Sequence, residues 1–164
     1  MDFRKTITCL ILACAWGAAA AAAQAEAVPL PVVSDLQAAA QRAREQRVPL
    51  FVAFTLKHCP YCNTARRDYW VPMNGSTEWR GKVLMVELVM DGEPALRGFN
   101  GEATTARDFA RSLGIRSAPT VVVFDNAGAP ATAPLIGLSS GDFYGVYLER
   151  AIEAGLRRVR AAPQ

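Results

Sequence analysis

Two cysteines lie two residues apart in Cys59-Pro60-Tyr61-Cys62, directly after a short apolar run and directly before a segment with helical preferences. The apolar run, residues 48–55, is nearly continuous, as in a central strand that is covered on both faces. Pro60 is tolerated in the first turn of the next helix, because its missing amide hydrogen would have no partner there. The pattern predicts a strand, a short loop and a helix that begins at the cysteine pair.

The rest of the chain alternates between helical and strand patterns and shows no internal repeat. Ser34 and Gln37 match a capping box, which predicts a helix over 34–47. We expect further helices over 60–69, 103–113 and 140–158, and strands over 83–90, 120–124 and 133–137. This order predicts an α/β fold, a three-layer α/β/α sandwich with a central mixed sheet.

The N-terminus has the features of a secretory signal peptide over residues 1–25. Arg4 and Lys5 precede a short apolar run, and an alanine-rich stretch follows it. We expect cleavage after Ala25, with Ala27 as the alternative. Two further interpretations stay open, an uncleaved N-terminal anchor and a lipoprotein processed at Cys14.

Export decides which cysteines remain in the mature chain. Cys9 and Cys14 fall inside the predicted signal peptide, so only Cys59 and Cys62 are left, in a compartment where disulfides persist. Residues 26–33 are expected to form a lead-in segment, and residues 34–160 a single domain. The net charge is only +3, which argues against a nucleic-acid partner, and we expect a monomer.

The position of Cys59 at a helix N-terminus predicts its chemistry. Unpaired amides and the partial positive charge of the helix end favour the thiolate, which is the attacking species in disulfide exchange. We therefore assign Cys59 as the nucleophile and Cys62 as the resolving cysteine. A protonated His58 would favour the thiolate further, and the alternative is an exposed polar residue at a loop end.

The cysteine pair has three further conceivable uses. His58 is the only histidine in the chain, so a four-ligand zinc site lacks donors, and we expect no metal or other cofactor. A purely structural role for the disulfide is less favoured. A ring this small removes little conformational entropy from the unfolded chain and so adds little stability. The main alternative is a redox-inert module that binds a partner, or that holds copper through Cys59, Cys62 and His58.

The chain resembles the thioredoxin superfamily in three places. These are the strand 51–55, the motif at 59–62, and Ser117-Ala118-Pro119-Thr120 at the opening of a later strand. The resemblance implies that Pro119 follows a cis peptide bond and faces the cysteine pair. It also implies that an extended stretch of the partner binds there, which assigns substrate contacts to Pro119, Ala118, Pro60 and Tyr61.

Residues 96–102 resemble the corresponding segment of bacterial SoxW-like periplasmic thioredoxins. This resemblance implies a periplasmic thiol-disulfide oxidoreductase that acts on protein disulfides or dithiols, as a reductant recharged by a membrane electron donor of the thiol-transporter type. An oxidase of protein thiols is the alternative direction. The Cys-Pro-Tyr-Cys tetrapeptide also occurs in glutaredoxins, but residues 120–128 look like the thioredoxin hairpin.

The chain departs from cytosolic thioredoxins beside the motif. Those proteins carry a tryptophan just before the first cysteine and a buried aspartate six positions before it, where this chain has His58 and Ala53. The usual proton acceptor for the resolving cysteine is therefore missing. We expect Glu87, on the predicted strand 83–90, either to replace it or to be an exposed carboxylate at the strand edge.

Overall fold

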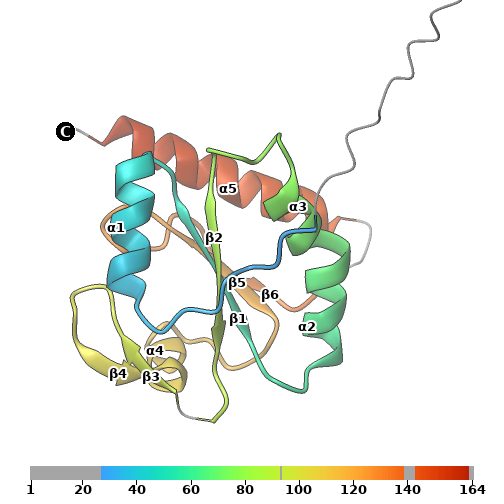
Figure 1. Ribbon diagram of the computed structural model, residues 1–164, viewed down its shortest axis with the longest axis vertical. Helices are drawn as coiled ribbons and strands as arrows, with labels where there is room; N and C mark the ends of the chain where they lie inside the picture. Colours follow the sequence, from blue (N-terminus) through green and yellow to red (C-terminus); the bar gives the residue numbers. More distant parts are fainter. Residues whose placement is uncertain (1–26, 93, 139–142, 163–164) are drawn as a thin grey trace, which may run out of the picture.

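A mixed sheet forms the centre of the computed structural model, which describes residues 27–92, 94–138 and 143–162. Its strands are β1 (Leu50–Thr55), β2 (Leu84–Val89), β5 (Thr120–Phe124) and β6 (Leu135–Ile136), in the order β2-β1-β5-β6 (Figure 1). β1 runs parallel to β2 and antiparallel to β5. The predicted mixed sheet is confirmed.

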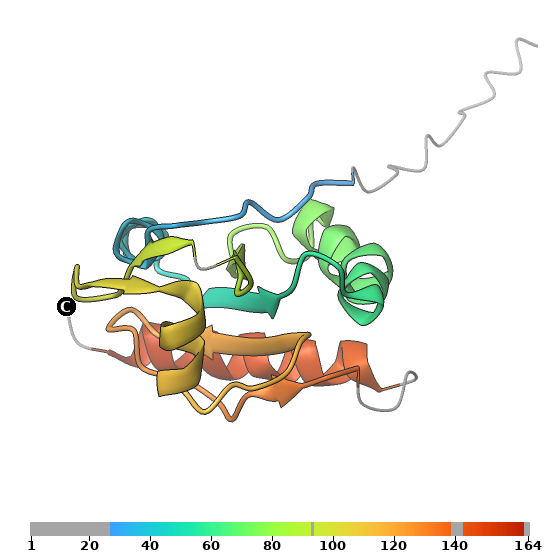
Figure 2. The same ribbon diagram turned by 90° about the horizontal axis from the view of Figure 1, so that it is seen from below.

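Helices cover both faces of this sheet. Side chains alternate along β1, so that Leu50, Val52 and Phe54 face α1 (Leu36–Gln46) and α4 (Ala106–Ser112). Phe51 and Ala53 face the opposite layer, which contains α2 (Pro60–Ala65) and α5 (Tyr144–Ala161). Figure 2 shows α1 and α5 on opposite sides of the sheet. The predicted three-layer α/β/α sandwich is confirmed.

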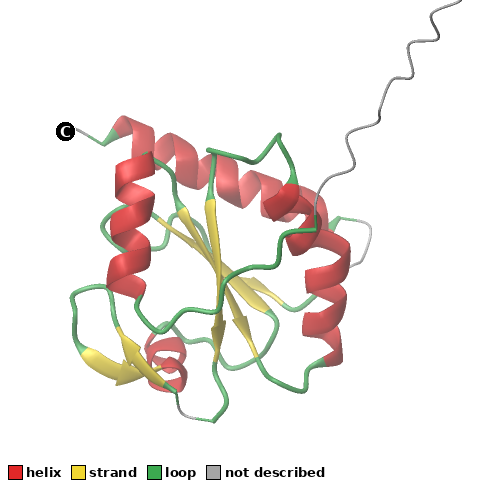
Figure 3. Cartoon of the chain, viewed as in Figure 1, coloured by secondary structure: helices red, strands yellow, loops and turns green. Residues whose placement is uncertain are grey.

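The helical region after the cysteine motif continues beyond the predicted end at residue 69. α2 is followed by one π-helical turn, η1 (Arg66–Trp70), and then by α3 (Val71–Gly75). Figure 3 colours this region as helix. Pro72 lies in the first turn of α3, where its missing amide hydrogen is tolerated. The fully buried indole of Trp70 fixes this region against the core.

A two-stranded hairpin between the second strand and the next helix was not predicted. β3 (Ala95–Arg97) pairs with β4 (Ala103–Thr105), and α4 begins only at Ala106, three residues later than expected. Gly101 in the turn has a positive φ of 82°, which glycine adopts without strain. Thr105 then caps α4 by accepting a hydrogen bond from the amide of Asp108, 3.1 Å away.

The predicted lead-in segment does more than lead into the domain, because one of its residues pairs with the sheet. Val32 forms an isolated parallel bridge with Glu87, whose backbone N–H donates to the carbonyl of Pro31 at 2.9 Å. This segment runs beside β2 in Figure 1 and covers its outer edge. The next helix is capped by Asp35 rather than by the predicted Ser34, and it begins at Leu36.

Two remaining predictions concern the ends of the chain, namely the signal peptide and the last helix. The predicted signal peptide lies outside the described residues, as do residues 140–142 of the predicted last helix. α5 is described from Tyr144 and extends to Ala161, three residues beyond the predicted end.

None of the helices in the described ranges is long and apolar enough to cross a membrane.

Candidate functional site

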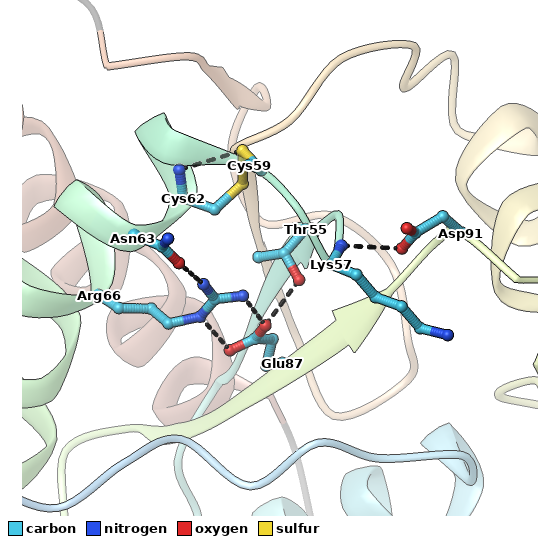
Figure 4. Close-up of polar contacts among 8 residues, drawn as sticks. All are labelled: Thr55, Lys57, Cys59, Cys62, Asn63, Arg66, Glu87 and Asp91. Atoms are coloured by element: carbon cyan, nitrogen blue, oxygen red, sulfur yellow. Dashed lines mark hydrogen bonds and ion pairs between the residues drawn. A yellow bond between two sulfur atoms is a disulfide. The ribbon is translucent and has the colours of Figure 1, made fainter.

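A disulfide joins Cys59 to Cys62 at the beginning of α2 (Figure 4). Cys59 is the N-cap residue, and its Sγ accepts a hydrogen bond from the backbone N–H of Cys62 at 3.1 Å. Cys59 retains 7% of its surface exposed, whereas Cys62 retains none. Of the two cysteines, only Cys59 therefore keeps any surface through which an attacking or leaving thiol can approach.

The residues around Cys59 form an exposed surface. His58 and Pro60 are exposed, and the side chain of Tyr61 is 68% exposed. The loop before the motif is held by Asp91, whose Oδ1 accepts a hydrogen bond from the backbone N–H of Lys57 at 3.0 Å. A partner can therefore contact these side chains without any rearrangement of the core.

Pro119 lies at the same end of the sheet as the cysteine loop. The β1–β5 register pairs Phe54 with Thr120, which places Pro119 beside the point where the chain leaves β1 for the motif. The bond between Ala118 and Pro119 is cis, as the resemblance implies. Pro119 is buried and Ala118 half-buried, and their contact with a partner stays a prediction.

Glu87 lies in the layer between the sheet and α2, not at an exposed edge, so the strand-edge interpretation was wrong. The residue is only 4% exposed. Its carboxylate accepts hydrogen bonds from Thr55 Oγ1 at 2.6 Å and from Arg66 Nε at 2.9 Å, and also from Arg66 Nη2 (Figure 4). The Nη1 of Arg66 donates to Asn63 Oδ1 at 2.7 Å, next to Cys62 in the chain.

This network is an ion pair between the buried Glu87 carboxylate and the partly buried Arg66 guanidinium. The hydrogen bond to Glu87 and the attraction of its charge raise the pKa of Arg66, and partial burial opposes this effect. No hydrogen bond joins Glu87 to Cys62 within the described residues. The role of Glu87 as proton acceptor therefore stays a prediction, and any proton transfer must reorganise the contacts with Arg66 and Thr55.

Thr55, Asn63 and Arg66 were missed at the sequence level. Arg66 lies four residues after Cys62, so both side chains are on one face of the helical region. That spacing was a usable signal for a charged residue near the motif. Its partner was not visible, because the pair also depends on the register that places Glu87 opposite Ala53 in the sheet.

The described residues contain no group of three or more His, Cys, Asp or Glu side chains that is arranged to hold a metal ion. The site thus consists of a disulfide at a helix N-terminus, a cis-proline at the neighbouring strand end and a buried ion pair beneath. These features define a thioredoxin-fold protein with a disulfide of the Cys-x-x-Cys type.

The family model for the thioredoxin-like domain matches residues 36–148. The chain belongs to this family. The matched range contains the whole site, from Thr55 to Pro119. A search of curated proteins finds no match.

Solved structures show the same fold. Thioredoxin from Malassezia sympodialis is 19% identical, with a TM-score of 0.53 over 79% of this chain and 95% of that chain. A wild-type thioredoxin h from poplar is 13% identical, with a TM-score of 0.54 over 75% of this chain and 96% of that chain. At these identities the likeness supports the fold and nothing further about substrates.

Proposed function

We propose that this protein is a periplasmic thiol-disulfide oxidoreductase that reduces protein disulfides, in the manner of the SoxW-like thioredoxins that its sequence resembles. The observation that carries the proposal is the unequal exposure of the two cysteines at the start of α2. Disulfide exchange needs one accessible thiolate and one protected thiol that resolves the intermediate. A structural staple needs no such asymmetry.

In the proposed reaction, the two thiols of the reduced protein become a disulfide while the substrate disulfide becomes two thiols. In the reduced protein, the Cys59 thiolate attacks one sulfur of the substrate disulfide, and the other substrate sulfur leaves as a thiolate. The Cys62 thiol loses its proton and attacks the Cys59 sulfur of the mixed disulfide. The second substrate thiolate leaves, so two electrons have moved to the substrate. One of its two thiolates takes up the equivalent of the proton that Cys62 released, and the other takes a proton from the solvent, which received one when the Cys59 thiolate formed.

The Cys62 amide supports the first step in a specific way. It donates to Cys59 Sγ at 3.1 Å in the oxidised state, and the same donor is in place to stabilise negative charge on that sulfur after reduction. The helix N-terminus adds its partial positive charge. Both effects favour the thiolate of Cys59 over that of Cys62.

The mechanism is tested by insulin reduction with the wild type, Cys59→Ser and Cys62→Ser. Cys59→Ser is expected to lose all activity, and Cys62→Ser to accumulate a mixed disulfide with its substrate, which identifies the partner. Activity that survives in Cys59→Ser would contradict the mechanism. A redox-inert binding module would show no exchange in any of the three proteins.

The direction of electron flow is tested by the reduction potential of the Cys59/Cys62 couple against glutathione. A reductant is expected near the thioredoxin value of about −270 mV, and an oxidant of protein thiols nearer to about −120 mV. The second value would overturn the reductant proposal while leaving the exchange chemistry intact.

The periplasmic location is tested by cell fractionation and N-terminal sequencing of the mature protein. We expect the protein in the periplasmic fraction with its N-terminus at Glu26, after removal of the predicted signal peptide. A cytoplasmic protein that begins at Met1 would contradict the location, and a membrane-bound one would favour an uncleaved anchor or a lipoprotein.

A further inference from the structure

A cavity of about 490 Å³ opens between α4 and the ends of β1 and β2. Its apolar part is formed by Leu56, Met90, Ala110 and Ile115. Three arginines line the same cavity, namely Arg107, Arg111 and Arg116. The cavity thus combines an apolar floor with cationic side chains, and the disulfide chemistry described above does not use it.

The arginines differ in how their charges are satisfied. Arg111 Nη1 forms an ion pair with Asp108 Oδ1 at 2.6 Å. Arg107 and Arg116 are exposed, and neither has an ion-pair partner within the described ranges. The cavity therefore has two uncompensated positive charges, and the ligand that they favour is an anion.

The cavity lies beside the redox site. Leu56 precedes Cys59 by three residues, and Ser117, which also lines the cavity, precedes Pro119 by two. The segment that leads to Cys59 and the segment that leads to Pro119 therefore each contain a residue that lines the cavity. An extended chain advances about 3.3 Å per residue, so a substrate bound across Cys59 and Pro119 reaches the cavity within a few residues of its own cysteine.

We propose that this cavity binds an acidic side chain of the protein substrate, a few residues from the substrate cysteine. The inference rests on the proposed function and specifies its substrate class. The carboxylate pairs with the guanidinium groups of Arg107 and Arg116, and its methylene groups lie against the apolar floor. Exposed charges of this kind act mainly on the association rate and on the choice of partner.

The test uses three synthetic peptides that each contain one cysteine as a mixed disulfide with 2-mercaptoethanol. They differ only at the positions a few residues before and after the cysteine, which are Glu, Gln or Lys. The second-order rate of their reduction by the reduced protein is measured at low ionic strength. We expect the Glu peptide to react about threefold to tenfold faster than the Gln peptide, and the Lys peptide to be slowest.

Two double variants locate the effect. Arg107→Gln/Arg116→Gln is expected to abolish the preference for the Glu peptide. Arg42→Gln/Arg160→Gln removes the same charge from exposed positions on α1 and α5 and is expected to retain the preference. Equal rates for the Glu and Gln peptides, or equal loss in both double variants, would overturn the inference.

The uncharged substrate 2-hydroxyethyl disulfide separates this inference from the proposed function. The wild type and both double variants are expected to reduce it at equal rates, because it has no carboxylate. A slower reaction of Arg107→Gln/Arg116→Gln alone would show that these arginines act on the cysteines and not on the substrate, and would overturn the inference. Failure of the wild type to reduce it would overturn the proposed function itself.

Discussion

The two faces of the sheet differ in what they bury. The face toward α1 and α4 is packed with apolar side chains, including the contacting rings of Phe99, Phe109 and Phe124. The face toward α2 and α5 is apolar as well, but it also buries Cys62 of the disulfide and two ionisable groups, Glu87 and Tyr144. A buried charge is costly unless it is paired, so a fold keeps one where it serves a purpose. The difference leads to the expectation that substitutions on the α1/α4 face change stability alone, whereas substitutions on the α2/α5 face can change the chemistry of the disulfide as well.

The largest effect on stability is expected on the apolar face. Phe124 is fully buried at the end of β5 that pairs with Leu50, far along the sheet from the cysteine loop. Phe124→Ala is expected to lower the free energy of unfolding by about 3–5 kcal/mol, because it removes apolar contact and leaves a cavity. Urea denaturation measures the loss.

The same variant tests whether the two faces act separately. The reduction potential of Phe124→Ala is expected to equal that of the wild type, measured where both proteins are folded. If the alanine variant does not fold, Phe124→Leu is measured in its place, because it removes less apolar contact and is expected to lower the free energy of unfolding less. A shift of the potential in either variant would show that the apolar face also adjusts the redox pair.

The next effect concerns the buried ion pair. Glu87→Gln retains the size of the side chain but leaves the partly buried guanidinium of Arg66 without its counter-charge, so we expect a loss of about 1–3 kcal/mol in unfolding free energy. If Glu87 also accepts the Cys62 proton, the pH profile of disulfide exchange changes as well. Stopped-flow rates between pH 5 and 9 measure this profile. Lost stability with an unchanged profile would show that the pair is only structural.

The double variant Glu87→Leu/Arg66→Met separates stability from chemistry more sharply. Replacing both partners with apolar groups removes the charge and its desolvation cost together, so the remaining cost is that of the buried Thr55 hydroxyl, which loses its acceptor, about 1–3 kcal/mol. Its exchange rate is expected to keep the altered pH profile of Glu87→Gln. A wild-type profile in this variant would exclude a proton-transfer role for Glu87.

The same contrast explains what the sequence could and could not predict. The strand, the motif and the helix start at Pro60 depend on local patterns, and these were predicted correctly. The Arg66–Glu87 pair depends on the sheet register and on a helix packed across it, which no local pattern contains. The β3–β4 hairpin was not predictable for another reason, because each of its strands has only three residues, which is too short to show an alternating pattern.

The smallest expected effect concerns Tyr144, a neutral polar group on the α2/α5 face. Its hydroxyl accepts a hydrogen bond from Trp70 Nε1 at 3.3 Å, and burial raises its pKa to about 12. In the unfolded chain a tyrosine pKa is about 10. The folded state therefore holds this proton more tightly. Its contribution to stability is complete below about pH 10 and is lost as the pH rises from about 10 towards 12.

Tyr144→Phe removes that pH dependence and leaves the Trp70 N–H without its acceptor. Near neutral pH we expect a loss of about 1 kcal/mol, at the low end for an unpaired buried donor because this hydrogen bond is long, 3.3 Å. Above about pH 10 the wild type loses its advantage, so the difference between the two proteins shrinks or reverses. Urea denaturation at pH 8, 10 and 11 measures this, with the exposed Tyr147→Phe as a control that should retain the wild-type slope. If Tyr144→Phe also retained that slope, the hydroxyl would be in contact with water, and the α2/α5 face would be less closed than the apolar face opposite.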